Sequence, residues 1–296
     1  MLTVEHRRTV TSKSKPTRVI LTADDFGSTL PVNEAVEQAH LYGILTSASL
    51  MVGAPATADA VQRAKNMPAL RVGLHLVLSD GWPTSRSEII PDLIDVNGYL
   101  PIGMIQAGFR FFFLQRVRRQ LEIEIRAQFD SFRGLGLTLD HVNVHKHFHL
   151  HPTILDMLIR IGPDYGMRAI RLPYEPLRVT CRISTSHAIK NIAWSIFIAP
   201  WVALLRTKLA SANIAHNDFL FGLSETGRMN EETLINIVNH LPHGINEIYF
   251  HPATSSLPAI KGSTRHDKEL KALLSPSVRE LFENLSIERI AYNDIA

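Results

Sequence analysis

The chain has 296 residues, a length that suits one large domain or two ordinary ones. With 45% hydrophobic residues, 20% charged residues and a net charge of +3, its composition excludes a disordered chain, a collagen-like repeat and a protein of many membrane spans. The single cysteine, Cys181, excludes an internal disulfide framework and a cysteine-rich zinc finger.

The first predicted segment is a disordered basic tail over residues 1–17. Arg7, Arg8, Lys13 and Lys15 stand there among serine, threonine and proline. The tail is short and has no interleaved aromatic residues, so we expect no nucleic-acid partner. It also lacks the apolar core of a secretory signal, which predicts a cytoplasmic protein.

Strand-like and helix-like segments alternate along the rest of the chain. Short apolar or β-branched runs predict strands, and apolar residues at helical spacing predict the helices between them. The predicted strands are 19–22, 44–52, 71–78, 139–145, 168–172, 217–222, 246–250 and 287–291. The predicted helices are 31–42, 56–66, 116–134, 152–161, 185–210, 230–240 and 277–285.

This alternation is typical of an α/β fold in which crossover helices join parallel strands. So many strand–helix units within 296 residues favour a single domain over residues 18–296, built as a deformed (β/α) TIM-like barrel with mostly parallel strands. The alternative is an open doubly wound sheet. A G-x-G-x-x-G motif after the first strand would favour that alternative, and the sequence has none there.

Two apolar stretches predict helical insertions in this domain, near 104–119 and 187–209. The first contains GFRFFFL at 108–114 with arginines directly after it, and the second contains IAWSIFIAPWVALL at 192–205. Neither reaches the roughly 20 apolar residues that span a bilayer. They are either ordinary core helices or interfacial elements that rest on a membrane or hold an apolar substrate tail.

Polar residues cluster at the carboxyl ends of the predicted strands, where the chemistry of βα barrels collects. The residues at these ends are Asp24, Asp25, His75, His145, Arg171 and His251. The histidines at 145, 147, 149 and 151 alternate, so they share one face as long as the chain stays extended. A metal ion takes only two or three ligands from such a cluster.

One aspartate and two histidines from separate strands predict an open metal site. A divalent ion there lowers the pKa of a bound water, a second carboxylate takes the proton, and a histidine protonates the leaving group. The sequence therefore predicts metal-assisted hydrolysis, with amide, ester and phosphoester substrates all open. Imidazole ligands suit Zn²⁺, whereas a site with several waters also suits Mg²⁺, so the identity of the single divalent ion stays open.

Four motifs resemble the YdjC-like carbohydrate deacetylases over residues 18–292. They are TADDFG at 22–27, GLHL at 73–76, the histidine run from His141 to Pro152, and FHP at 250–252. The wording HVNVHKHFHLHP, together with IRLPYEP and FRFFF, most closely resembles the hopanoid-biosynthesis-associated branch (HpnK). Members of that branch remove the acetyl group from an N-acetylglucosaminyl hopanoid.

The resemblance implies a role for each matching residue. Asp25, His75 and His145 become the metal ligands, Asp24 the general base, His251 the general acid, and Arg171 a residue that orients the substrate or the base. His147 and His149 have no role fixed by the motif and are assigned to the sugar pocket or to hydrogen bonds around it. Asn143 stands where the family often has an aspartate, so a carboxylate beside the metal ligands is missing.

The resemblance also gives the apolar stretches a purpose, because a glycolipid must present its sugar at the barrel mouth while its tail stays in an apolar environment. The aromatic residues proposed to contact this tail or the membrane are Phe109, Phe111, Phe112, Phe113, Trp194, Phe197 and Trp201. We therefore expect a metal-dependent carbohydrate N-deacetylase, cytoplasmic and in peripheral contact with the inner membrane, that acts on an N-acetylglucosamine-bearing lipid. The alternatives are a soluble chitooligosaccharide deacetylase and a catalytically silent glycolipid-binding protein of the same fold.

Overall fold

A computed structural model of the protein describes residues 16–177, 179, 188–255 and 265–296. The side chains of residues 188–198 lie outside this description. Nearly all of the predicted tail at 1–17, Cys181, and the side chains of Trp194 and Phe197 therefore lie outside the described residues. No helix of the described part is long and apolar enough to cross a membrane.

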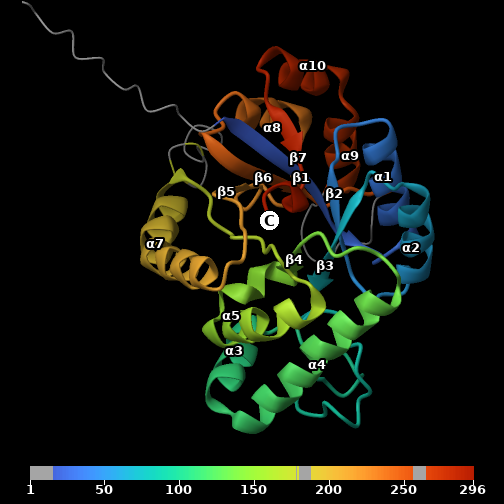
Figure 1. Ribbon diagram of the computed structural model, residues 1–296, viewed down its shortest axis with the longest axis vertical. Coiled ribbons are helices and arrows are strands. Elements are labelled where there is room, and N and C mark those ends of the chain that lie inside the picture. The colour runs from blue at the N-terminus through green and yellow to red at the C-terminus, as the bar shows by residue number, and fades with distance from the viewer. Residues whose placement is uncertain (1–15, 178, 180–187, 256–264) are drawn as a thin grey trace, which may run out of the picture.

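The strands form one curved parallel sheet with the order β4-β3-β2-β1-β6-β5, and β7 pairs with β1 beside this path (Figure 1). The strands are β1 (Thr17–Phe26), β2 (Ser47–Leu50), β3 (Arg71–Leu76), β4 (Val142–Val144), β5 (Phe219–Phe221), β6 (Gly244–Phe250) and β7 (Glu288–Ile290). All pairings between these strands are parallel.

The gap between β4 and β5 is closed by the segment predicted as a strand at 168–172. The Val142 amide donates to the Ala169 carbonyl at 3.0 Å, and the Ile170 amide donates to the Ala215 carbonyl at 2.9 Å. These contacts are isolated parallel bridges rather than a full strand. They confirm the predicted deformed, TIM-like barrel in a single α/β domain.

Helices surround the sheet. They are α1 (Leu30–Leu41), α2 (Thr57–Asn66), α3 (Met104–Phe113), α4 (Gln115–Gly134), α5 (Pro152–Ile161), α7 (Ala188–Ser211), α8 (Glu231–Val238), α9 (His266–Leu274) and α10 (Pro276–Asn284). Short 3₁₀ helices are η1 (His145–Leu150), η2 (Gly162–Tyr165) and η3 (Tyr292–Asp294). In Figure 1, α1 and α2 lie to the right of the sheet, α7 lies to the left, and α3, α4 and α5 form the lower end.

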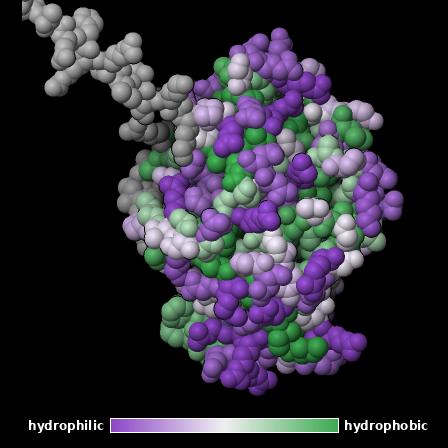
Figure 2. Space-filling view, viewed as in Figure 1, coloured by the Kyte–Doolittle hydropathy of each residue, from purple (hydrophilic) through white to green (hydrophobic). Residues whose placement is uncertain are grey.

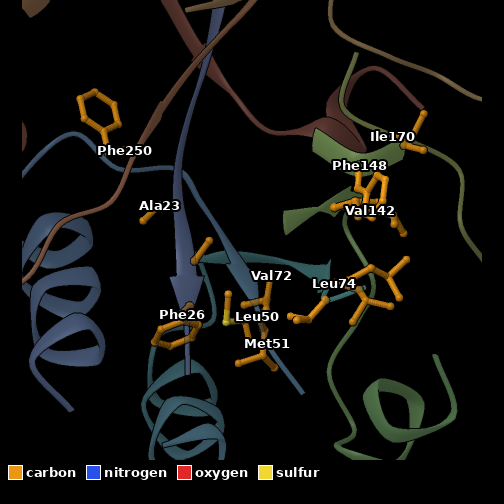
Figure 3. Packing of buried hydrophobic residues seen from close by; sticks show 14 of the residues in the cluster. Ala23, Phe26, Leu50, Met51, Val72, Leu74, Val142, Phe148, Ile170 and Phe250 are labelled. Atoms are coloured by element: carbon orange, nitrogen blue, oxygen red, sulfur yellow. The ribbon is translucent and has the colours of Figure 1, made fainter. Parts of the chain in front are cut away.

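The two faces of β1 explain where the site lies. Val19, Leu21 and Ala23 point outward into the large core between the sheet and the helices, whereas Ile20 joins a small cluster with Tyr292 inside the barrel. By alternation, Thr22 and Asp24 follow Ile20 on the inward face. The barrel interior is thus apolar near the start of β1 and polar near its carboxyl end. At that end the outer core closes over Phe26, Leu50 and Met51 (Figure 3).

One sequence-based prediction about the histidine run is wrong. The predicted strand at 139–145 ends at Val144, and His145 begins η1. Within η1, Lys146 and His147 both have a φ of 56°, so the chain turns sharply there. The histidines from 145 to 151 therefore do not share one extended face. The turn instead sends their side chains in different directions around the barrel mouth.

Candidate metal centre and active site

Asp25, His75 and His145 meet at the barrel mouth from the ends of β1, β3 and β4. Asp25 Oδ1, His75 Nε2 and His145 Nδ1 form a triangle in which every side measures 3.3 Å. Donor atoms that each lie about 2.0–2.2 Å from one ion are at most about 4.4 Å apart, so this triangle fits a shared divalent cation. Asp25 Oδ1 is buried and has no hydrogen-bond donor, as expected for an atom meant to contact a metal.

A β-bulge allows two consecutive aspartates to serve the same site. The register between β1 and β2 shifts between Ala23 and Phe26, and Asp25 has a φ of 62°. In a regular strand Asp24 and Asp25 would point to opposite faces, whereas an inserted residue re-aims one of them. The bulge therefore turns Asp25 toward the two histidines while Asp24 stays on the inward face of the barrel.

Asp24 is held by a buried arginine. Arg171 Nη1 and Nη2 donate to Asp24 Oδ2 and Oδ1 at 2.5 and 2.9 Å, and the amide of Asn143 donates to Oδ1 at 3.0 Å. Burial acts to raise the pKa of Asp24, but the charge and hydrogen bonds of Arg171, together with the nearby His75 and His251, outweigh it and hold the pKa well below its usual range. Asp24 therefore stays a carboxylate, which is the form that accepts a proton.

The geometry favours one of the two roles considered for Arg171. Its side chain is completely buried, so the guanidinium is not open to a substrate. Besides Asp24, it contacts Glu247 through Nε at 2.9 Å and Nη2 at 2.7 Å. Arg171 thus orients the carboxylate of Asp24, and the structure gives it no direct contact surface for a sugar.

His147 and His149 take different places around the mouth. His147 Nε2 lies 3.3 Å from the Tyr249 hydroxyl, and the residue as a whole is half-buried. His149 is buried, and its Nε2 contacts the Arg171 carbonyl at 2.9 Å. The tautomer of His149 that donates this bond anchors η1 to the segment that closes the barrel. Of the two, His147 is the one placed to contact a substrate.

His251 follows β6 and is fixed through its backbone. Its amide donates to Glu269 Oε2 at 2.5 Å, its carbonyl contacts the His266 ring, and its own ring lies edge-on to Tyr249 with centroids 5.4 Å apart. Burial lowers the pKa of the His251 ring, against the opposing effect of Asp25 and Asp24. A ring with a lowered pKa is mostly neutral near pH 7, so His251 must take up a proton before it can act as a general acid, and it then gives that proton up readily.

The buried acid that positions His251 makes stability depend on pH. Burial raises the pKa of Glu269 to about 8, and backbone N–H groups offset this only in part. The pKa of Glu269 is higher in the folded chain than in the unfolded chain. The stabilisation that protonated Glu269 gives the folded state is therefore fully present below pH of about 4.5 and is lost as pH rises through about 8. We expect the free energy of unfolding to fall by up to about 1.4 kcal/mol per pH unit in that window.

Urea unfolding of the parent chain and of Glu269→Gln at pH 5, 7 and 9 measures this dependence. Gln keeps an acceptor for the backbone but does not ionise, so the variant should lose the decline with pH. Asp267, an exposed residue of the same helix that pairs with Lys271, provides the control. Asp267→Asn should keep the parent's decline of the unfolding free energy with pH. Equal slopes for Glu269→Gln and the parent would show that Glu269 does not hold its proton in the folded chain.

Two residues on the inward face of β6, Glu247 and Tyr249, were not predicted as site residues, although the sequence pattern could have identified them. Glu247, Tyr249 and His251 stand at alternate positions, so they share one face of the strand. Glu247 bonds Arg171, and the Tyr249 ring lies 4.9 Å from the Arg171 guanidinium carbon. A charged and an aromatic polar residue in phase with His251 mark the barrel-facing side of this strand.

Comparisons with known proteins agree with this arrangement. The family model described as YdjC-like protein matches residues 18–284. A carbohydrate deacetylase of Brevibacillus brevis is 27% identical over 282 residues, which cover 94% of this chain and 99% of the relative. A carbohydrate deacetylase of Geobacillus stearothermophilus is 28% identical over 284 residues, with 94% and 98% covered.

A solved structure supports the fold in the same way. The crystal structure of a protein from Enterococcus faecalis V583, whose description concerns cellobiose-phosphate cleavage, superposes with a TM-score of 0.73. The two sequences are 23% identical, and the match covers 94% of this chain and 98% of the other. This likeness concerns the barrel and its helices.

Proposed function

The chain belongs to the family of YdjC-like proteins, and from that premise we propose that it is a metal-dependent carbohydrate N-deacetylase. Relatives named carbohydrate deacetylase align with 94% of the chain. The observation that carries the proposal is the 3.3 Å triangle of Asp25, His75 and His145 with the Asp24 carboxylate beside it. The donor set of one carboxylate and two imidazoles suits a divalent ion, with Zn²⁺ and Mg²⁺ both in keeping with it.

The chain's own residues divide the work of amide hydrolysis. Asp25, His75 and His145 would hold a divalent ion, which when bound would supply a Lewis acid that acidifies water and polarises a carbonyl. Asp24, kept ionised by Arg171, accepts the proton as a water oxygen bonds to the acetyl carbon. His251 donates a proton to the departing sugar nitrogen as the carbon–nitrogen bond breaks, which yields acetate and an amine.

We extend the proposal to the substrate, an N-acetylglucosaminyl hopanoid or a similar glycolipid, on the basis of an exposed apolar surface beside the site. This α3 aromatic surface consists of Phe109, Phe112 and Phe113 with Ile105 and Leu114, which are 48–80% exposed. Contiguous exposed apolar residues of this kind mark interaction sites. In Figure 2 the hydrophobic residues over α3 lie at the lower left of the molecule, next to hydrophilic residues.

The α3 aromatic surface is attached to the loop that holds the metal ligand His145. Phe111, on the buried side of α3, packs on Phe148 of η1 with ring centroids 5.4 Å apart. From the other direction, Trp201 of α7 donates its indole N–H to the Leu150 carbonyl at 2.8 Å. Helices α3 and α7 thus both adjoin η1. This supports an apolar contact for a lipid tail, or for the membrane that holds it, next to the barrel mouth.

Acetate release by the purified protein tests both levels of the proposal. The chain is stripped of metal, reloaded, and given N-acetylglucosaminyl hopanoid in detergent or diacetylchitobiose in buffer, with mass spectrometry following the loss of one acetyl group. We expect metal-dependent turnover of the lipid. Turnover of the free sugar alone would keep the chemistry and remove the lipid substrate, and no acetate from either would contradict the deacetylase.

Matched variants separate the apolar surface from the chemistry. Phe109→Ser and Phe113→Ser remove two rings that stack 6.2 Å apart on α3, so we expect a higher KM for the lipid and unchanged metal binding. Leu41→Ser on α1, at a comparably exposed residue, should leave the KM for the lipid unchanged. An unaltered KM in the Phe variants would exclude this surface from substrate contact.

A further inference from the structure

A chain of buried hydrogen bonds runs from the candidate metal ligand His75 on β3 to Asp140, which directly precedes the neighbouring strand β4. His75 Nδ1 lies 2.6 Å from Asn143 Oδ1, and Asn143 Nδ2 lies 2.9 Å from Ser49 Oγ. Ser49 Oγ lies 3.0 Å from His141 Nε2, and His141 Nδ1 lies 2.9 Å from Asp140 Oδ2. All five side chains are buried.

The orientation of the Asn143 amide follows from its neighbour Asp24. A carboxylate only accepts hydrogen bonds, so the group facing Asp24 Oδ1 at 3.0 Å must be the amide nitrogen. The amide oxygen then faces His75, and an oxygen without a hydrogen requires that His75 Nδ1 carry the proton. In the neutral ring this leaves a lone pair on Nε2, the atom that lies 3.3 Å from Asp25 Oδ1.

The remaining links have a consistent direction. Asp140 is an acceptor, so His141 carries its proton on Nδ1 and presents Nε2 as an acceptor. Ser49 Oγ accepts a hydrogen bond from the amide of Asn143, so its O–H is free to donate to His141 Nε2. With this polarity every donor in the chain meets an acceptor, from His75 through to Asp140. The other oxygen of Asp140 accepts the backbone N–H of Asn293 at 3.0 Å.

The residues packed around His141 hold its ring in this position. A Cβ atom on Gly73 would come within 2.5–2.6 Å of the His141 ring, so the glycine of the GLHL motif is what admits the imidazole. On its other side the ring stacks on Tyr292, with centroids 4.7 Å apart. His141 is thus held between a strand backbone and an aromatic ring, and its nitrogens stay aligned with Ser49 and Asp140.

We propose that Asp140, His141 and Ser49 are positioning residues that act through Asn143, fixing the His75 tautomer whose Nε2 is free for a metal ion. Asn143 also links this chain to Asp24, so one amide aligns a metal ligand and the base. This inference rests on the proposed function only in taking His75 as a ligand. It also explains why Asn143 serves where a carboxylate was expected, since a carboxylate could not donate to Asp24 and Ser49.

Asp140→Asn tests the polarity with almost no change of shape. Its single amide oxygen cannot accept from both His141 and the Asn293 N–H. The substitution therefore disturbs the donor-to-acceptor direction of the hydrogen bonds along the chain. We expect Zn²⁺ affinity, measured by titration of metal-free protein, to fall, with the about 10–100-fold cost of losing a direct partner of a metal-ligating histidine as the upper bound. Ser49→Ala, which breaks the chain in its middle, should show a loss in the same range.

Ser47→Ala is the matched control for Ser49→Ala. Ser47 lies on the same strand, is equally buried, and its hydroxyl has no hydrogen-bond partner in the described structure. The control should therefore bind Zn²⁺ as the parent does. Parent-like affinity in both Asp140→Asn and Ser49→Ala would overturn the proposal, as would an equal loss in Ser47→Ala.

Nitrogen NMR of metal-free protein labelled at histidine reads the tautomer directly. The His75 signals, assigned by their loss in His75→Asn, should show Nδ1 protonated in the parent and an altered or mixed state in Asp140→Asn. A neutral parent ring that carries its proton on Nε2 alone, at a pH where the ring is not a cation, would refute the inference. If the parent binds no divalent ion, the proposed function fails by itself, and the tautomer still decides on the positioning chain.

Discussion

Replacement of Asp24 by asparagine is expected to lower kcat for acetate release by about 10²–10⁴-fold while Zn²⁺ still binds. The variant keeps the size of the side chain but removes the carboxylate that accepts the proton. The metal donor atoms belong to Asp25, His75 and His145, so the triangle keeps all three. Single-turnover acetate release and Zn²⁺ titration on the same preparation separate the two effects.

The same variant distinguishes an enzyme from a silent binding protein of this fold. A binding protein does not use Asp24 as a base, so ligand affinity would change little and no turnover would be present to lose. Asp130→Asn is a suitable control because that exposed carboxylate pairs with Arg133 on the outer helix α4 and has no contact with the site residues. Turnover by Asp24→Asn within about tenfold of the parent would remove Asp24 from the role of general base.

The sequence predicted the barrel and a group of polar residues at its mouth because both follow from short-range patterns, and the resemblance to the YdjC-like deacetylases selected Asp25, His75 and His145 from that group as ligands. Alternating strand and helix signals predict a parallel barrel, and polar residues at strand ends predict convergence at its mouth. His75 and Asp25 were placed by this logic. Which of Asp24 and Asp25 faces a metal was not deducible from spacing, because that depends on a bulge and on the positive φ of Asp25.

The turn at η1 and the buried hydrogen-bond networks could not be predicted from the sequence, for a different reason. Lys146 and His147 adopt positive φ angles that glycine would have signalled and that these residues do not. Ser49 and His141 are 92 positions apart, and Arg171 and Asp24 are 147 apart. Such contacts exist only once the barrel closes, so local pattern identifies the residues and not their partners.

Arg171→Met is expected to lower the free energy of unfolding by about 3–5 kcal/mol at neutral pH. Arg171 lies between two buried carboxylates, Asp24 and Glu247, and its removal leaves both without their cation. A buried charge that has lost its partner destabilises the folded state by more than the intact ion pair stabilised it. Arg171→Lys should recover little of this loss, because a single ammonium cannot replace the paired contacts that the guanidinium makes to both carboxylates.

The pH dependence of this loss identifies its cause. In the parent, the lowered pKa of Asp24 gives a stability contribution that is present above its unfolded pKa and lost only as pH falls below that value. Without the arginine, burial acts on Asp24 without its main opposing charge and raises the pKa of that carboxyl, so the folded state then favours its protonated form. The deficit of Arg171→Met should therefore be larger at pH 8 than at pH 5.

Adding Glu247→Gln to Arg171→Met separates charge from packing. The second change removes one unpaired carboxylate and keeps an amide that contacts Tyr292, whose hydroxyl donates to Glu247 at 2.5 Å in the parent. If charge causes the deficit, the double variant should be more stable than Arg171→Met at pH 8. If lost packing caused it, the two variants would unfold alike, since Gln and Glu fill the same space.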